Sequence, residues 1–314
     1  MRKKNGVLII LLIFLLVGFG DPTASNKKPG ESPVLKGASQ GQYLGQEPPG
    51  MKPVAFALGI VSTPVHEYSI TISKDGREIF FTRLAGKLSH IFFSKYQGGK
   101  WTPPEIAPFS GKFNDYDQSF SPGGDKLFFT SDRPVTGSNW IGDIWVVTRS
   151  GSGWTRPKPL SDTINTKVNE AYPSLTTRGT LYFHAVYSPK DHCDIYRSEF
   201  VNGKYCKPEA LGPGVNSANS EYDAFIAPDE KFIIFVRPDE GFGEGDLFIS
   251  FRKDDRWTRA VNMGPAVNTS AREYCPGVSP DGKYLFFTRF DRVKRIRGEI
   301  YWVSAKIIES LRPN

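Results

Sequence analysis

Histidine and cysteine are scarce in this sequence, with four and three residues among 314. The histidines at positions 66, 90, 184 and 192 do not have the spacing of zinc ligands. The Gly-x-Ser-x-Gly sequence of α/β-hydrolases is also missing. These absences argue against zinc and serine hydrolases, so we expect neither a catalytic residue set nor a bound cofactor.

The cysteines, Cys193, Cys206 and Cys275, are odd in number and lie far from the N-terminus. None of them lies near a cleavage site, which argues against a lipid anchor. In an oxidising compartment at least one thiol would be unpaired or joined to another chain. The spacing does not predict a disulfide.

The first 20 residues have the composition of a secretory signal peptide. Three basic residues precede an uncharged apolar run over 7–17, and small glycines follow it. An uncleaved anchor is the alternative, but the run is shorter than the roughly 20 residues that a spanning helix needs. Residues 21–50 are rich in proline and glycine and predict a disordered linker. We therefore expect a periplasmic or secreted protein without a stable membrane span, whose single domain covers 51–314.

A formal charge of +7 could suggest nucleic acid, but the positions of the charges do not. Three of the positive residues lie in the predicted signal peptide, and a local excess lies in the segment 289–297. A nucleic-acid surface would spread its charges along one face. The pattern therefore indicates one basic loop.

The strongest signal is an internal repeat. Five segments begin with an acid, pass through a short strand to a polar turn, and enter a strongly apolar strand. Their opening acids recur every 48 to 55 residues: Glu67, Asp115, Glu170, Glu221 and Glu273. Each unit continues with a variable loop and a third strand. In the first four units a hairpin turn follows, and an aromatic residue is then expected to begin the fourth strand: Trp101, Trp154, Tyr205 and Trp257. Four short strands in a period near 50 are typical of β-propeller blades.

The fourth strand of the fifth unit is supplied from the N-terminal side. The segment KPVAFALGIVS at 52–62 is similar to KPEALGPGVNS at 207–217, which ends the third unit. We therefore predict an all-β fold with five four-stranded blades, closed by the N-terminal strand. Six blades remain an alternative if 21–50 contains a degenerate unit.

The repeat motif resembles that of the TolB-like propellers of exported bacterial proteins. The resemblance rests on SPDGKYLFFTR at 279–289 and on the third strands that begin with Asp followed by Ile or Leu. It covers nearly everything after residue 52. It implies a propeller that binds partners in the cell envelope, although the family also includes enzymes.

Five variable loops are expected around one mouth of the central channel, at 84–89, 132–142, 186–193, 238–245 and 290–298. Loops on a rigid scaffold commonly carry function. The departures from the repeat in these loops are basic or aromatic and are our candidate binding residues: Arg133, Trp140, Phe242, Arg292, Lys294, Arg295 and Arg297.

The opening acids have two interpretations. They could form a ring that holds Ca²⁺, which prefers oxygen ligands. An acid repeated in every blade is better explained by hydrogen bonds to backbone N–H groups at each strand entrance. We favour this structural role.

These features predict a monomeric binding or scaffolding module for an envelope protein or glycan. The alternative is a carbohydrate-active hydrolase or lyase that uses carboxylates at the channel mouth.

Overall fold

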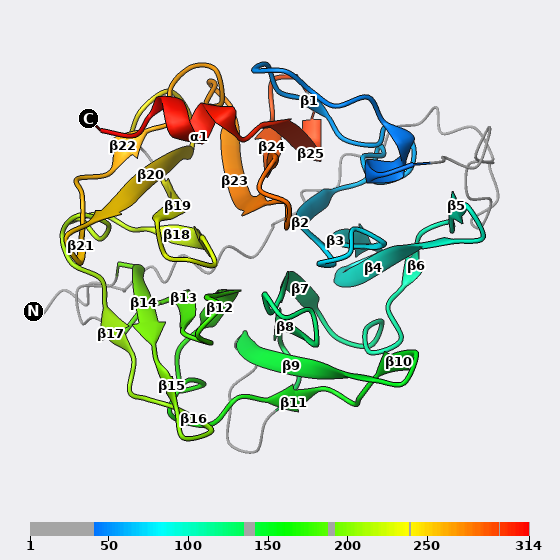
Figure 1. Ribbon diagram of the computed structural model, residues 1–314, viewed down its shortest axis with the longest axis horizontal. Helices are drawn as coiled ribbons and strands as arrows, with labels where there is room; N and C mark the ends of the chain where they lie inside the picture. The colour runs from blue at the N-terminus through cyan, green and yellow to red at the C-terminus, as the bar shows by residue number, and fades with distance from the viewer. Residues whose placement is uncertain (1–40, 135–141, 188–191, 239, 295, 314) are drawn as a thin grey trace, which may run out of the picture. The chain divides into compact units, whose positions relative to one another are not determined.

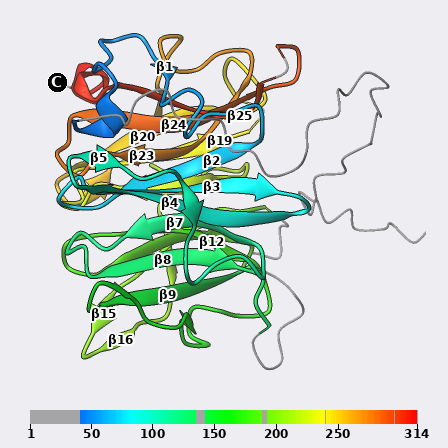
Figure 2. The same cartoon turned by 90° about the vertical axis from the view of Figure 1, so that its right-hand side faces the viewer.

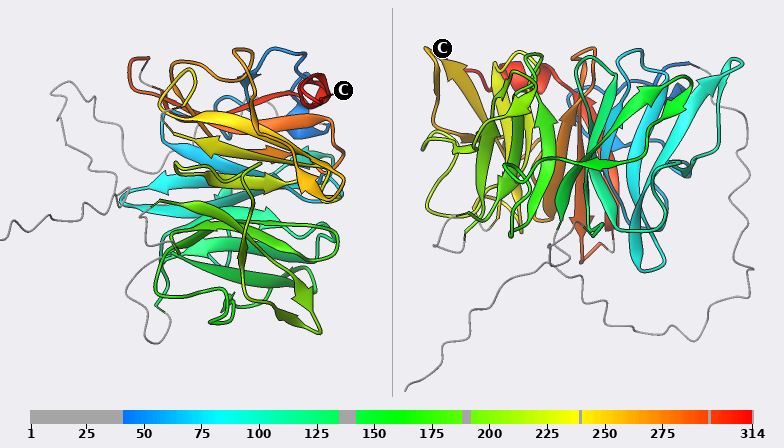
Figure 3. Two further views of the ribbon diagram at one scale, coloured as in Figure 1. Left: turned by 90° about the vertical axis from the view of Figure 1, so that its left-hand side faces the viewer. Right: turned by 90° about the horizontal axis from the view of Figure 1, so that it is seen from below.

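The computed structural model describes residues 41–134, 142–187, 192–238, 240–294 and 296–313, all within one compact unit that begins at residue 37. In this part of the chain the strands form five blades around a channel (Figure 1). Figure 3 shows the strands of the blades running between two opposite faces. The predicted all-β, five-bladed propeller is confirmed.

Each blade begins with an inner strand beside the channel and continues outward. The inner strands are β2 (Glu67–Ile72), β7 (Asp115–Phe120), β12 (Glu170–Leu175), β18 (Tyr222–Ile226) and β23 (Arg272–Val278). The second strands are β3 (Glu78–Ala85), β8 (Lys126–Ser131), β13 (Leu181–Ala185), β19 (Phe232–Arg237) and β24 (Tyr284–Asp291). The third strands are β4 (Leu88–Gln97), β9 (Asp143–Ser150), β14 (Asp194–Ser198), β20 (Asp246–Lys253) and β25 (Ile296–Ser304).

The outer edge of each blade is short. The outer strands are β6 (Glu105–Ile106), β11 (Lys158–Pro159), β17 (Glu209–Ala210), β22 (Val261–Asn262) and β1 (Val54–Ala55). The aromatic residues predicted to begin the fourth strands lie in separate hairpin arms: β5 (Lys100–Trp101), β10 (Gly153–Trp154), β16 (Lys204–Tyr205) and β21 (Arg256–Trp257). The arm of the third blade pairs with β15 (Phe200–Val201).

The last blade contains the N-terminal strand, as predicted. Val54 lies opposite Trp302 and Ala55 opposite Tyr301 in an antiparallel β1–β25 pair. The backbone N–H of Phe56 donates to the carbonyl of Ile300 at 2.7 Å, and the Phe56 ring is fully buried against Trp302. Closure covers the outer edge of β25, which would otherwise be free to pair with another chain.

Residues 41–50, which the composition assigned to the linker, lie against the propeller. The short helix η1 (Tyr43–Gly45) buries Leu44 in the core between the last and first blades. The indole N–H of Trp101 donates to the carbonyl of Gly41 at 2.8 Å. The predicted signal peptide and residues 21–40 lie outside the described residues.

The core consists of apolar clusters between neighbouring blades. The second strands are buried on both sides, so β3 and β19 are nearly continuous apolar runs instead of alternating patterns. The helix α1 (Lys306–Ser310) adds Ile307 and Ile308 to the cluster between the last two blades. None of the described helices has the length and apolar character needed to cross a bilayer.

The connections between second and third strands share one face, which we call the loop face. Figure 2 shows the β3–β4 and β24–β25 hairpins projecting on the same side of the propeller. The opposite face carries the turns between first and second strands. The placement of the variable loops around one mouth therefore agrees with the predicted blade geometry.

Candidate functional site

The opening acids are buried at the entrances of the inner strands. Glu67, Asp115, Glu170, Glu221 and Glu273 all have an exposed fraction of 0%. Glu67 is typical: Thr63 donates its backbone N–H at 3.1 Å and its hydroxyl at 2.5 Å. The guanidinium of Arg83 donates to the same carboxylate at 2.7 Å. Each acid thus bonds to groups of its own blade, which supports the structural role over the calcium ring.

Arginines at the ends of second strands neutralise these acids. Arg237 and Arg289 repeat the role of Arg83, at 2.9 Å from Glu221 and 2.6 Å from Glu273. In the second blade Arg133 takes this place, 2.7 Å from Asp115, and it stacks over the Phe129 ring. Arg133 is only 9% exposed. The structure therefore places this candidate binding residue in the blade and not on the surface.

The third blade lacks this arginine. Ala185 lies opposite Glu170, where Arg83 lies opposite Glu67. Burial raises the pKa of Glu170 from its usual 4.5 to about 7. Hydrogen bonds from Thr166, at 3.1 Å from N–H and 2.6 Å from the hydroxyl, do not offset the loss of solvent.

An exposed surface lies where the last two blades meet on the loop face. Phe242 is 51% exposed and Val293 is 92% exposed. The two loops are adjacent, because Arg292 lies 3.7 Å from Glu244. Asp291 accepts hydrogen bonds from the backbone N–H groups of Val293 and Lys294 and thereby shapes the hairpin tip.

The predicted cations of this hairpin are largely exposed. Arg292 and Lys294 expose 73% and 69% of their side chains, and Arg297 is also exposed. We call Phe242, Arg292, Val293, Lys294 and Arg297 the basic patch. Two other candidates, Trp140 and Arg295, lie outside the described residues. Val293 was missed by the sequence analysis, because a single valine in a basic segment gives no signal.

A second site, which the sequence analysis did not predict, lies in the central channel. Every inner strand carries a β-bulge two residues after its opening acid, where the backbone has a positive φ of 47° to 57°. The residues at this position are Ser69, Asp117, Tyr172, Asp223 and Cys275. Their variation within an otherwise regular repeat was the available signal.

Two acids and a thiol meet at the level of the bulges. The Cys275 sulfur is 3.7 Å from both Asp117 Oδ1 and Asp223 Oδ2. Burial, and then the Asp223 carboxylate, raise the pKa of Asp117 well above its ordinary range. Burial also raises the pKa of the Cys275 thiol, which keeps it protonated. His184, on the second strand of the third blade, is 8% exposed and accepts the backbone N–H of Asp223 at 3.0 Å.

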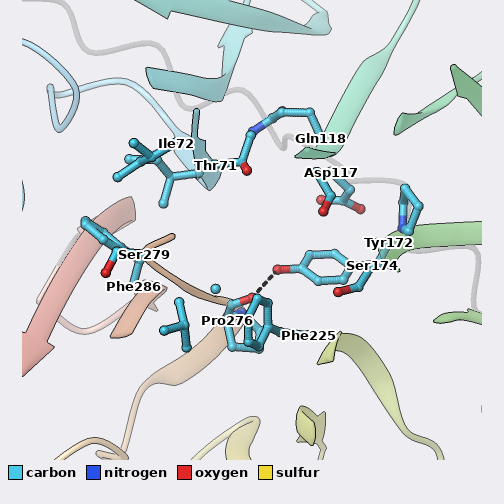
Figure 4. Close-up of a pocket in the computed structure, with 15 residues that line it drawn as sticks. Thr71, Ile72, Asp117, Gln118, Tyr172, Ser174, Phe225, Pro276, Ser279 and Phe286 are labelled. Atoms are coloured by element: carbon cyan, nitrogen blue, oxygen red, sulfur yellow. Dashed lines mark hydrogen bonds between the residues drawn. The ribbon is translucent and has the colours of Figure 1, made fainter. Parts of the chain in front are cut away.

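A pocket leads to the level of the bulges from the face opposite the loop face. It is bordered by Asp117, Tyr172 and Pro276 at the bulges and by Ile72 and Ser279 near the strand ends. Figure 4 shows the Tyr172 hydroxyl reaching Pro276, to whose carbonyl it donates at 2.7 Å. Within the described residues no three His, Cys, Asp or Glu side chains are placed to hold a metal ion. All three cysteines are free, with only Cys206 exposed.

The fold is that of a TolB-like β-propeller. A structure of TolB from Agrobacterium tumefaciens has a TM-score of 0.50 and 16% identity, with 73% of this chain and 72% of that chain covered. TolB from Acinetobacter baumannii has a TM-score of 0.51 and 18% identity over 78% of this chain and 59% of that one. An α-L-arabinofuranosidase from Podospora anserina has a TM-score of 0.48 and 10% identity over 81% and 96% of the two chains. No protein family and no curated protein matches the sequence. At these identities the likeness concerns the fold.

Proposed function

We propose that this protein is an exported binding module that engages an acidic partner of the cell envelope, a protein or a glycan, through the basic patch. The carrying observation is that exposed cations and exposed apolar side chains lie on the same two adjacent loops. Interfaces commonly combine an apolar centre with a polar rim. Phe242 and Val293 would form the centre, and Arg292, Lys294 and Arg297 the rim.

The cations of the basic patch are available to a partner. The Arg292–Glu244 pair, at 3.7 Å, is exposed, and such pairs contribute little. The Lys294 side chain is 69% exposed, although its partner Asp291, 3.6 Å away, is buried. Arg297 has no ion pair among the described residues. Arginine can also bind a carboxylate or phosphate through two parallel hydrogen bonds. The patch therefore favours an anionic surface.

The opening acids do not support the hydrolase alternative. Their carboxylates are 0% exposed and accept hydrogen bonds from their own blades. A glycosidase needs one carboxyl group to protonate the leaving oxygen and a second to act on the sugar or on water. The binding module is therefore the function that the geometry supports best.

The test is capture of envelope proteins and cell-wall glycans by the folded domain and by a variant with Arg292→Ala, Lys294→Ala and Arg297→Ala. A matched control removes three exposed charges near the far end of β20: Lys253→Ala, Arg256→Ala and Arg259→Ala. We expect the patch variant to bind a captured partner at least about tenfold more weakly, since three rim pairs of about 0.5 kcal/mol each sum to roughly 1.5 kcal/mol. The control variant should bind normally, and equal losses in both variants would contradict the proposal.

A further inference from the structure

The central channel forms a narrow shaft between the level of the bulges and the face opposite the loop face. Its walls combine apolar side chains, such as Phe225 and Val278, with polar ones, such as Thr71, Ser119 and Ser174. Cys275 and Ser279 lie four residues apart along the same chain, so the shaft is at most about 13 Å long at 3.3 Å per residue. Its cavity volume is about 40 Å³. A single water needs about 10–15 Å³ on this measure, so the space suits a slim unbranched chain and not an aromatic ring.

The inner end of the shaft carries a buried carboxylate with an unused acceptor. Asp117 is 7% exposed. Its Oδ1 faces the Cys275 thiol, whose single hydrogen is also within reach of Asp223. Within the described residues Asp117 Oδ2 accepts no hydrogen bond, and neither Asp117 nor Asp223 forms an ion pair with lysine or arginine. Burial and the Asp223 carboxylate raise the pKa of Asp117, and a cation bound beside it would lower this pKa and favour the carboxylate.

Two acceptor groups at this end favour a cation. Figure 4 shows the Asp117 carboxylate and the Tyr172 hydroxyl directed into the same space. Because Tyr172 donates its hydrogen to Pro276, its oxygen lone pairs remain available as acceptors. Acceptor oxygens at the end of a narrow shaft match a primary ammonium group, which has three donors and can be carried on a slim alkyl stem.

We propose that the channel binds a primary alkylammonium group from the opposite face, with the ammonium at Asp117 and the alkyl chain in the narrow shaft. This site is separate from the basic patch and does not depend on the proposed function. The ammonium belongs either to a free amine or to the side chain of a lysine on a partner. An anion is excluded by the acid pair.

The first experiment is a calorimetric titration of the folded protein with n-butylamine, at a neutral pH where the amine is charged. We expect saturable binding of one amine. The neutral 1-butanol, which has the same chain, and the bulky trimethylbutylammonium ion should not bind at the same concentration. Nα-acetyl-lysine methylamide separates the two sources: binding indicates a lysine side chain, and binding of n-butylamine alone indicates a free amine.

Two variants test the acid and the shaft independently. Asp117→Asn should weaken n-butylamine binding about 10- to 100-fold, since hydrogen bonds to charged groups contribute roughly 1.5–3 kcal/mol. Asp255→Asn, in an exposed turn, is the control that should bind normally. Gly277→Leu keeps both acids but fills the shaft, because a Cβ at Gly277 would only touch the Ile70 carbonyl at 3.4 Å. This variant should abolish binding even if Asp117→Asn does not fold.

Three results would overturn the proposal. The first is that the wild-type protein does not bind n-butylamine, and the second is that Gly277→Leu binds it as well as the wild type does. The third is that Zn²⁺ binds with proton release, displaces the amine and loses its affinity in Cys275→Ala. That outcome would assign the acid pair and the thiol to a metal instead.

Discussion

Glu170→Gln removes the opening acid that, among the described residues, has no arginine partner. The folded protein raises the pKa of Glu170 from 4.5 to about 7. Because the folded state holds this proton more tightly than the unfolded state, its contribution to stability is complete below pH 4.5 and is lost as the pH rises to 7. The 2.5-unit difference corresponds to about 3 kcal/mol of unfolding free energy at 1.36 kcal/mol per unit.

Glutamine remains neutral at every pH, so Glu170→Gln should remove this loss. We expect wild type and variant to have similar unfolding free energies at pH 4.5, and the variant to be more stable by up to about 3 kcal/mol at pH 8. The assay is urea unfolding followed by tryptophan fluorescence across this pH range. Parallel pH profiles for the two proteins would refute the reasoning.

The matched control is Glu221→Gln in the next blade. Glu221 accepts a hydrogen bond from Arg237 at 2.9 Å, and the Arg237 side chain is 9% exposed. Removing one partner of a buried pair leaves an uncompensated charge and typically costs about 3–5 kcal/mol. Burial raises the pKa of Glu221 as well, but Ser217 and Arg237 oppose this shift by stabilising the carboxylate. The variant loses these contacts and should be less stable than wild type at pH 8, in contrast to Glu170→Gln.

Two further predictions concern closure and the thiols. Phe56→Ala should lower the unfolding free energy by about 3–5 kcal/mol, because it empties a fully buried site behind the closing strand; a urea-unfolding loss below about 1 kcal/mol would show that closure contributes little. Among the cysteines, Cys206 should react with a thiol reagent in the folded protein, whereas Cys193 and Cys275 should react only after unfolding, because they are 3% and 4% exposed. Equal reaction rates for the three thiols would contradict their placement.

Much of the fold could be predicted because each blade repeats the same physical pattern. The opening acids, the apolar second strands and the turns recur at fixed places in the sequence, and residues 52–62 are similar to the fourth strands they replace. The packing of residues 41–50 against the propeller could not be predicted, because Leu44 and Tyr43 are isolated apolar residues in the sequence and their contacts are with distant strands.

The sites were less predictable because they depend on which side chains meet in space. Arg133 departs from the repeat by two positions, so it was interpreted as a loop residue although it bonds to Asp115 as the other blade arginines do to their acids. Asp117, Asp223 and Cys275 are up to 158 residues apart and meet only through ring closure and the bulges. Exposure of Phe242 was predictable, since glycines flank it on both sides.

The pairing of β1 with β25 also has a consequence for the order of folding. Val54 and Trp302 are neighbours in the sheet, yet 248 positions separate them in the chain. When the ribosome has synthesised the first four blades, β25, the partner of β1, has not yet been made. β1 can therefore pair with β25 only after nearly the whole chain has emerged. Contacts over such long separations form slowly, because the loop-closure entropy must be overcome first. The five blades can therefore begin to form in sequence, but the last step joins the earliest part of the propeller to the latest.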